Sequence, residues 1–140
     1  MNNKQIGLVQ QSYEKLIPIS LEAGELFYRN LFELDPSLRA MFKKDIKQQG
    51  QKLMTMLGTA VMLLGDLEKL LPIAKSLGER QFEYGVKDKH YAVVGTALIC
   101  TLAQGLGKDF SSDIEKAWLA VYHQLTLVMK EAAQQKAVAI

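Results

Sequence analysis

The sequence contains few of the residues that carry catalytic or metal chemistry. Among its 140 residues there are one cysteine and two histidines. The single cysteine, Cys100, excludes an internal disulfide, and its place within ALICTL predicts a buried small hydrophobic side chain rather than a reactive thiol. His90 and His123 lie far apart, which leaves no Ser-His-Asp constellation and no cluster with metal-ligand spacing.

Charge of one sign and long apolar runs are also lacking. The formal net charge is +2, which is too small to predict binding to nucleic acid or to an anionic membrane. The longest apolar run, residues 60–64, is far too short to cross a bilayer. The first residues, MNNKQIGLVQQ, contain no apolar run typical of a signal peptide. We therefore expect a cytoplasmic protein with no membrane or nucleic-acid partner.

The remaining composition is that of one globular domain. Hydrophobic residues make up 49% of the chain and charged residues 23%, as in ordinary globular proteins. The length allows one sizeable core. No repeat, low-complexity tract or linker divides the chain, so we predict a single domain over residues 1–140, with a tail that frays from about residue 131.

Apolar residues recur at helical spacing along most of the chain, and no segment alternates with the period of a strand. Helix starts are predicted at Asn2 or Asn3, at Ser20, after the Asp35-Pro36 pair and at residues 111–113. Helix ends are predicted at residues 65–66, at Gly78 and at residues 105–107. The sequence therefore predicts an all-α fold of about seven helices of unequal length.

The most specific pattern lies in residues 77–102, LGERQFEYGVKDKHYAVVGTALICTL. Six of its residues match the pattern H-x-x-x-G-V-x-x-x-H-Y-x-x-V-G: Gly85, Val86, His90, Tyr91, Val94 and Gly95. This stretch resembles the proximal side of the haem pocket in bacterial single-domain globins, the Vitreoscilla-type haemoglobins, and in the haem domain of flavohaemoglobins. The resemblance extends over about residues 6–129 and implies a globin fold packed around a haem-type pocket. The first His of the pattern binds the haem iron in that family, and Gln81 stands at its position here.

Three earlier segments match distal pocket positions of the same family. Tyr28 in FYRNLF corresponds to a Tyr that donates a hydrogen bond to a bound gas, and Phe42 in DPSLRAMF to a Phe stacked on the porphyrin. In QQGQKLM, Gln49 and Leu53 share one helix face and correspond to the distal polar residue and the apolar residue above the iron, with Gln48 as the alternative to Gln49. From spacing alone, Tyr28 and Phe42 would be interpreted as aromatic core residues, and Gln49 as part of a solvated helix surface.

On the proximal side, Tyr91 and Val94 match pocket-lining positions. Trp118 and Tyr122 match the AWxxxY signature of the last helix. By spacing alone all four are core residues. Neither histidine corresponds to the missing iron ligand.

Gln81 changes the expected chemistry of the iron site. Histidine supplies an imidazole nitrogen, whereas a Gln amide offers only a carbonyl oxygen, which binds iron weakly. In the family a Tyr and a Glu orient that His. The resemblance places Tyr91 at the first position and Ala133 at the second, so the ligand and one of its partners are both missing. The metal position is therefore Gln81, with weak or no ligation, and Gln49, Tyr28 or water are the other candidate ligands.

Three interpretations stay open. The first is a globin that binds haem b and a diatomic gas, oxygen or nitric oxide, with an atypical proximal side and without efficient reversible oxygen transport. The second is a haem-free globin-like sensor or protein-interaction domain, and the third is an oxygen-binding globin altered at Gln81 by design or drift. The four retained distal residues favour haem, because an empty slot would reduce stability.

No enzymatic activity is predicted for the chain by itself. It has no G-x-G-x-x-G motif and no second domain, so nitric oxide dioxygenation would need a separate reductase. A homodimer is left open.

Overall fold

The computed structural model describes residues 2–41, 45–83 and 88–139. Within these ranges there are no strands and six α-helices: α1 (Asn3–Leu16), α2 (Ser20–Leu34), α3 (Ile46–Met62), α4 (Leu67–Glu83), α5 (Asp88–Leu106) and α6 (Ser112–Ala139). Short 3-10 segments stand between them: η1 (Ile17–Ile19), η2 (Pro36–Met41), η3 (Leu63–Gly65) and η4 (Gly107–Asp109). The all-α prediction is confirmed. The expected count of about seven helices was slightly high, because the segment after Asp35 is a 3-10 turn.

Local sequence signals place the helix boundaries. The Asn2 side chain accepts a hydrogen bond from the Gln5 backbone N–H at 2.8 Å, and the Gln5 side chain accepts one from the Asn2 N–H, which together form a capping box. Before α6, the Ser111 Oγ accepts a hydrogen bond from the Ile114 N–H at 3.2 Å. Gly107 follows α5 with a φ of 54°, a conformation that favours glycine. These starts and this end agree with the sequence predictions.

Gly78 does not end a helix, and that prediction is wrong. Helix α4 continues through it to Glu83. A Cβ atom on Gly78 would lie 2.7 Å from the Cα of Met129 in α6 and would overlap the carbonyl oxygen of that residue. The glycine therefore permits the backbones of α4 and α6 to approach each other. This role depends on a partner helix and cannot be distinguished from a helix break by periodicity.

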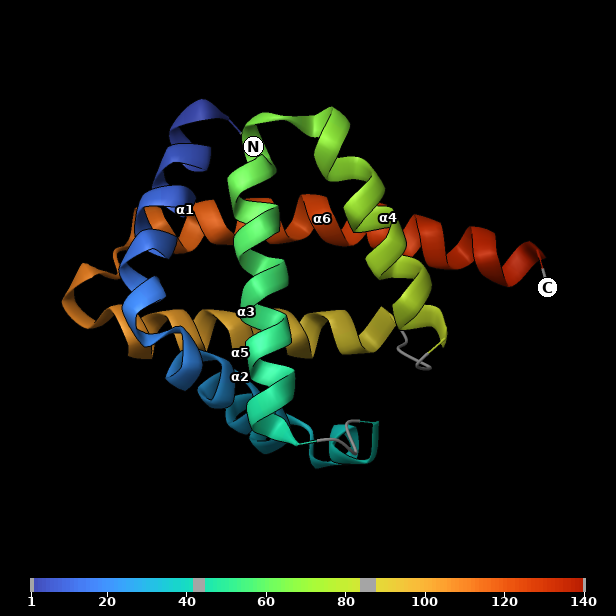
Figure 1. Ribbon diagram of the computed structural model, residues 1–140, viewed down its shortest axis with the longest axis horizontal. Coiled ribbons are helices and arrows are strands. Elements are labelled where there is room, and N and C mark those ends of the chain that lie inside the picture. The colour runs from blue at the N-terminus through green and yellow to red at the C-terminus, as the bar shows by residue number, and fades with distance from the viewer. Residues whose placement is uncertain (1, 42–44, 84–87, 140) are drawn as a thin grey trace.

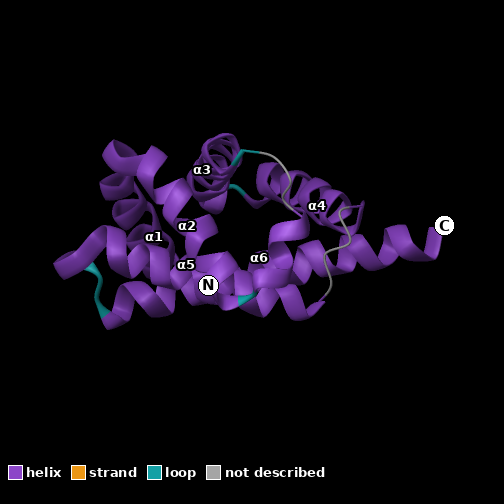
Figure 2. Cartoon of the chain, turned by 90° about the horizontal axis from the view of Figure 1, so that it is seen from below, coloured by secondary structure: helices purple, strands orange, loops and turns teal. Residues whose placement is uncertain are grey.

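The helices form two layers, with α3 and α4 lying across α5 and α6 (Figures 1 and 2). Helix α3 packs mainly on α2, whereas α4 packs mainly on α6. As a result, α3 and α4 diverge from their connection at η3 (Figure 1). Helix α6 runs to Ala139. Ala132, within this stretch, is buried.

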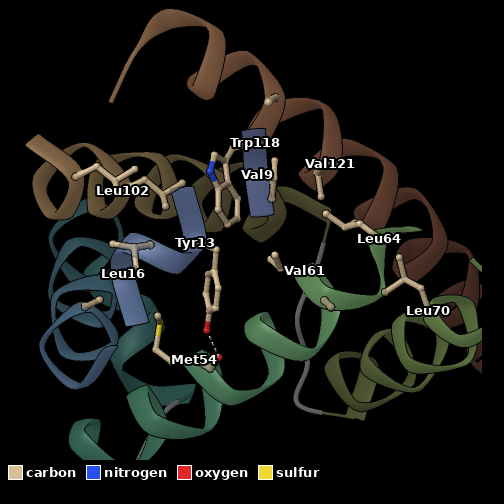
Figure 3. Close-up of a cluster of buried hydrophobic side chains, with 14 residues drawn as sticks. Val9, Tyr13, Leu16, Met54, Val61, Leu64, Leu70, Leu102, Trp118 and Val121 are labelled. Atoms are coloured by element: carbon tan, nitrogen blue, oxygen red, sulfur yellow. Dashed lines mark hydrogen bonds between the residues drawn. The ribbon is translucent and has the colours of Figure 1, made fainter. Parts of the chain in front are cut away.

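The larger of two hydrophobic clusters joins α1 to α3, α4, α5 and α6 (Figure 3). Its buried polar atoms are paired across helices. The Trp118 Nε1–H donates to the Ser12 Oγ at 2.8 Å, and the Tyr13 hydroxyl donates to the Met54 carbonyl at 2.8 Å. Unpaired polar groups in this core would be destabilising, so these bonds fix α1 against α6 and α3.

Helix α5 is the most apolar of the described elements. The segment Lys89–Asp109, which takes in most of α5 and the η4 turn, is long and apolar enough to cross a membrane by length and composition alone. Central helices of all-α proteins share that property, and α5 packs against α2, α6 and α1 here.

Candidate functional site

A second, smaller hydrophobic cluster lies where α2, α3 and α5 meet. Its buried members are Phe27, Tyr28 and Leu31 of α2, Leu38 of η2 and Ala97 of α5. Leu53 of α3 and Val94 of α5 pack against these residues but are themselves only partly buried. The structure thus brings together Tyr28, Leu53 and Val94, three residues of the predicted pocket that come from three different helices.

Tyr28 supplies the polar group of this cluster. Its side chain is 6% exposed. Its ring stands edge-on to Phe27 with centroids 5.1 Å apart, and the tilted ring of Phe32 has its centroid 5.9 Å away. Burial raises the pKa of the Tyr28 phenol to about 12, because the charged form loses its hydration. The phenol therefore stays protonated at neutral pH and can act as a hydrogen-bond donor.

A close helix crossing holds Tyr28 and Leu53 near each other. A Cβ atom on Gly24 would lie 2.6 Å from the carbonyl oxygen of Gly50, so the backbones of α2 and α3 touch at this point. Tyr28 follows Gly24 by four residues and Leu53 follows Gly50 by three, so each stands about one turn beyond the crossing. Sequence reasoning missed this contact, although a glycine inside each of two amphipathic helices was an available signal.

Gln49 lies on α3 one turn before Leu53. It is half-buried, whereas Gln48 is exposed. Of the two alternatives, Gln49 is therefore the one whose side chain is turned toward the protein. Its role at the distal side stays a prediction.

Tyr91 of α5 is buried and tied to α6. Its carbonyl accepts a hydrogen bond from the Tyr122 hydroxyl at 2.5 Å. Burial, and secondly the neighbouring Tyr91, raise the pKa of Tyr122 well above its usual value. A Cβ atom on Gly95 would lie 2.7 Å from the Tyr122 Cε1, which explains why a glycine suits this position of the sequence pattern.

The ring of Tyr91 also contacts a lysine of α6. The Lys130 Nζ stands 5.2 Å from the centroid of the Tyr91 ring, a contact that sequence reasoning missed.

Two predicted site residues cannot be placed in this arrangement. Phe42 lies outside the described residues, and Gln81 is described only as part of the last turns of α4, without its side chain. Their roles stay predictions, as does that of Ala133. Among the described residues no three of His, Cys, Asp or Glu form a group that could hold a metal ion.

The remaining singled-out residues are spread over the fold. His90 is buried near the start of α5, and His123 is exposed on α6. Cys100 is a free thiol that is partly rather than fully buried.

Comparison with known proteins agrees with this architecture. The model of the globin family matches residues 25–129. Neuroglobin from Danio rerio is 28% identical over 136 residues, which cover 87% of this chain and 86% of that protein. Flavohemoprotein from Bordetella parapertussis is 29% identical over 131 residues, covering 87% of this chain but 33% of its own length.

A solved structure has the same fold. The crystal structure of a hexacoordinated heme protein from an anhydrobiotic tardigrade, at pH 4, superposes with a TM-score of 0.87. The match covers 96% of both chains at 14% sequence identity. The predicted globin fold is therefore confirmed.

Proposed function

This chain is a member of the globin family, and from that premise we propose that it binds haem b and, through it, oxygen or nitric oxide. The observation that carries the proposal is the meeting of Tyr28, Leu53 and Val94 in one cluster. Two of these residues were predicted at the distal side of the pocket and one at the proximal side. Their helices are held by contacts far apart in the sequence, so the grouping is a property of the fold.

The described walls of the proposed pocket are apolar. Leu53 and Val94 are apolar side chains that the protein covers only partly, and burial of such surface against a flat apolar ring is favourable. When bound, haem supplies an iron atom that takes up a diatomic gas. The protonated Tyr28 phenol would be the residue to donate a hydrogen bond to the partly negative gas ligand.

The proximal side is the unusual part of the proposal. Position 81 in α4 supplies an amide in place of an imidazole, and an amide oxygen is a weak ligand for iron. We therefore expect the haem to be held mainly by apolar contacts and the ferric state to be favoured. Such a protein would bind a gas or an anion without serving as an efficient reversible oxygen carrier.

We propose that the chain binds the gas but does not, by itself, catalyse a reaction of it. Dioxygenation of nitric oxide would need electrons from a separate reductase. The flavohemoprotein relatives are about three times as long as the matched part, so the activity of the whole relative is not transferred to this chain. A cytoplasmic location completes the proposal.

Titration of the purified protein with haemin tests the proposal directly. We expect a saturable shift of the Soret absorption band that ends at one haemin per chain, with displacement of the band when cyanide or nitric oxide is added. Tyr28→Phe should retain haemin and release the gas faster, because it removes the hydroxyl but keeps the ring.

A haem-free sensor or protein-interaction domain is the alternative, favoured by the residue at position 81. An unchanged spectrum of free haemin in the presence of the protein would support this alternative and reject the proposed function. The same titration with Gln81→His then shows whether haemin fails to bind because the pocket does not accept it or because the iron lacks an axial ligand.

A further inference from the structure

Three helices meet at residues 129 and 130 of α6. The backbone of Met129 lies against Gly78 of α4, and the next side chain, Lys130, reaches the ring of Tyr91 in α5. The resemblance places Tyr91 at the proximal side of the pocket, so the Lys130 ammonium group stands against a residue of the proposed proximal wall.

We propose that Lys130 sets the electrostatic potential of the proximal wall and raises the reduction potential of haem bound in this pocket. This inference rests on the proposed function. It assigns to Lys130 a positioning role that acts through Tyr91 and through its charge, and it does not make Lys130 an iron ligand.

The geometry around Lys130 supports a fixed charge rather than a mobile surface cation. Its Nζ stands 5.2 Å from the Tyr91 ring centroid, within the range of a cation–π contact. Tyr91 is 6% exposed and its backbone is held by the Tyr122 hydroxyl. The Lys130 side chain is itself partly buried. A charge in such a place is less screened than one surrounded by water.

The charge is also not neutralised by a described carboxylate. Among the described residues the ion pairs of lysines are Lys15 with Asp109 and Lys69 with Asp66. A positive charge near an iron porphyrin disfavours the ferric form, which carries one more positive charge than the ferrous form. Lys130 would therefore partly offset the ferric preference expected from the missing imidazole.

Spectroelectrochemical titration of the haemin-loaded full chain tests this inference. Lys130→Gln keeps most of the side-chain length and removes the charge, and Lys130→Arg keeps both the charge and the contact with the ring. Lys116→Gln is the matched control, because Lys116 is an exposed lysine of the same helix. We expect Lys130→Gln to lower the midpoint potential, and Lys130→Arg and Lys116→Gln to leave it near that of the parent. The difference between parent and Lys130→Gln should shrink at high salt.

The outcomes separate this inference from the proposed function. If haemin binds at one per chain and Lys130→Gln has the midpoint potential of the parent, the inference is rejected and the proposed function stands. An equal drop in Lys116→Gln would also reject it, since the effect would then come from net charge alone. If neither the parent nor Gln81→His binds haemin, the proposed function fails and this inference fails with it. Circular dichroism of each variant shows whether the fold is retained.

Discussion

Gly24 of α2 and Gly50 of α3 lie backbone against backbone. A Cβ atom on either residue would come within 2.8 Å of main-chain atoms of the other, a distance that real side chains do not adopt. This contact determines how closely α2 and α3 can cross. It therefore also determines the space between Tyr28 and Leu53, which stand one turn beyond it.

Gly24→Ala should lower the free energy of unfolding by about 1–3 kcal/mol, because the added methyl group overpacks a contact made by backbone atoms that cannot turn away. The control is Gly7→Ala in α1, where a Cβ atom would meet nothing within 4 Å. That change should stabilise the protein by roughly 0.5–1 kcal/mol through helix propensity alone. Urea denaturation followed by circular dichroism measures both. Equal effects of the two variants would mean that the crossing is looser than described.

Ser12→Ala should destabilise the protein by about 1–3 kcal/mol, because it leaves the indole N–H of Trp118 buried without an acceptor. Trp118 is 1% exposed and donates to the Ser12 Oγ. Ser76→Ala, at an exposed position of α4, is the control and should change stability little. Trp118 is the only tryptophan, so its fluorescence follows both the indole environment and unfolding. A Ser12→Ala protein as stable as the control would argue that water or another group replaces the hydroxyl.

Alkaline pH should destabilise the protein in part through Tyr28. Its pKa is about 12 in the folded chain against an ordinary 10.0, so the unfolded state loses this proton first. The contribution is fully present below pH 10 and is lost as the pH rises through 12. At pH 11 the loss is about 1–1.5 kcal/mol relative to Tyr28→Phe. Denaturation of both proteins at pH 8 and pH 11 measures the difference, and parallel losses in the two would contradict a raised pKa at Tyr28.

Gln81→His should slow the loss of haemin by at least about tenfold, since an iron–imidazole bond of even 1.4 kcal/mol net would suffice. Transfer of haemin to an excess of apomyoglobin measures this rate. Gln51→His is a suitable control, because Gln51 is an exposed residue of α3 that was not predicted to line the pocket. If Gln81→His retains haemin no longer than the parent, residue 81 does not stand at the proximal position.

Features encoded by neighbouring residues were predictable from the sequence. The capping box of Asn2 and Gln5 and the left-handed conformation of Gly107 each depend on a few adjacent residues. Such features can therefore be recognised from the local sequence. The approach of Tyr28, Leu53 and Val94 was predicted only through the resemblance to the bacterial globins, because their grouping depends on three helices.

Features that need a partner helix were missed or misread. Gly78 has the sequence signature of a helix break, yet its function is to let α4 reach Met129 of α6. Lys130 lies in a polar stretch and would be assigned to a solvated surface, but its Nζ stands over the Tyr91 ring. In both cases the deciding neighbour is about 40–50 residues away in the sequence.

The hydrogen bond between Ser12 and Trp118 joins residues that are 106 positions apart, and α1 makes its most extensive contacts with α6. During vectorial synthesis on the ribosome, the first helix therefore emerges long before the element that covers it. The apolar surface of α1 that α6 covers, which includes the surroundings of Ser12, therefore lacks its native cover until translation reaches Trp118. Slow translation of the segment before α6 would prolong the time during which this surface of α1 is uncovered.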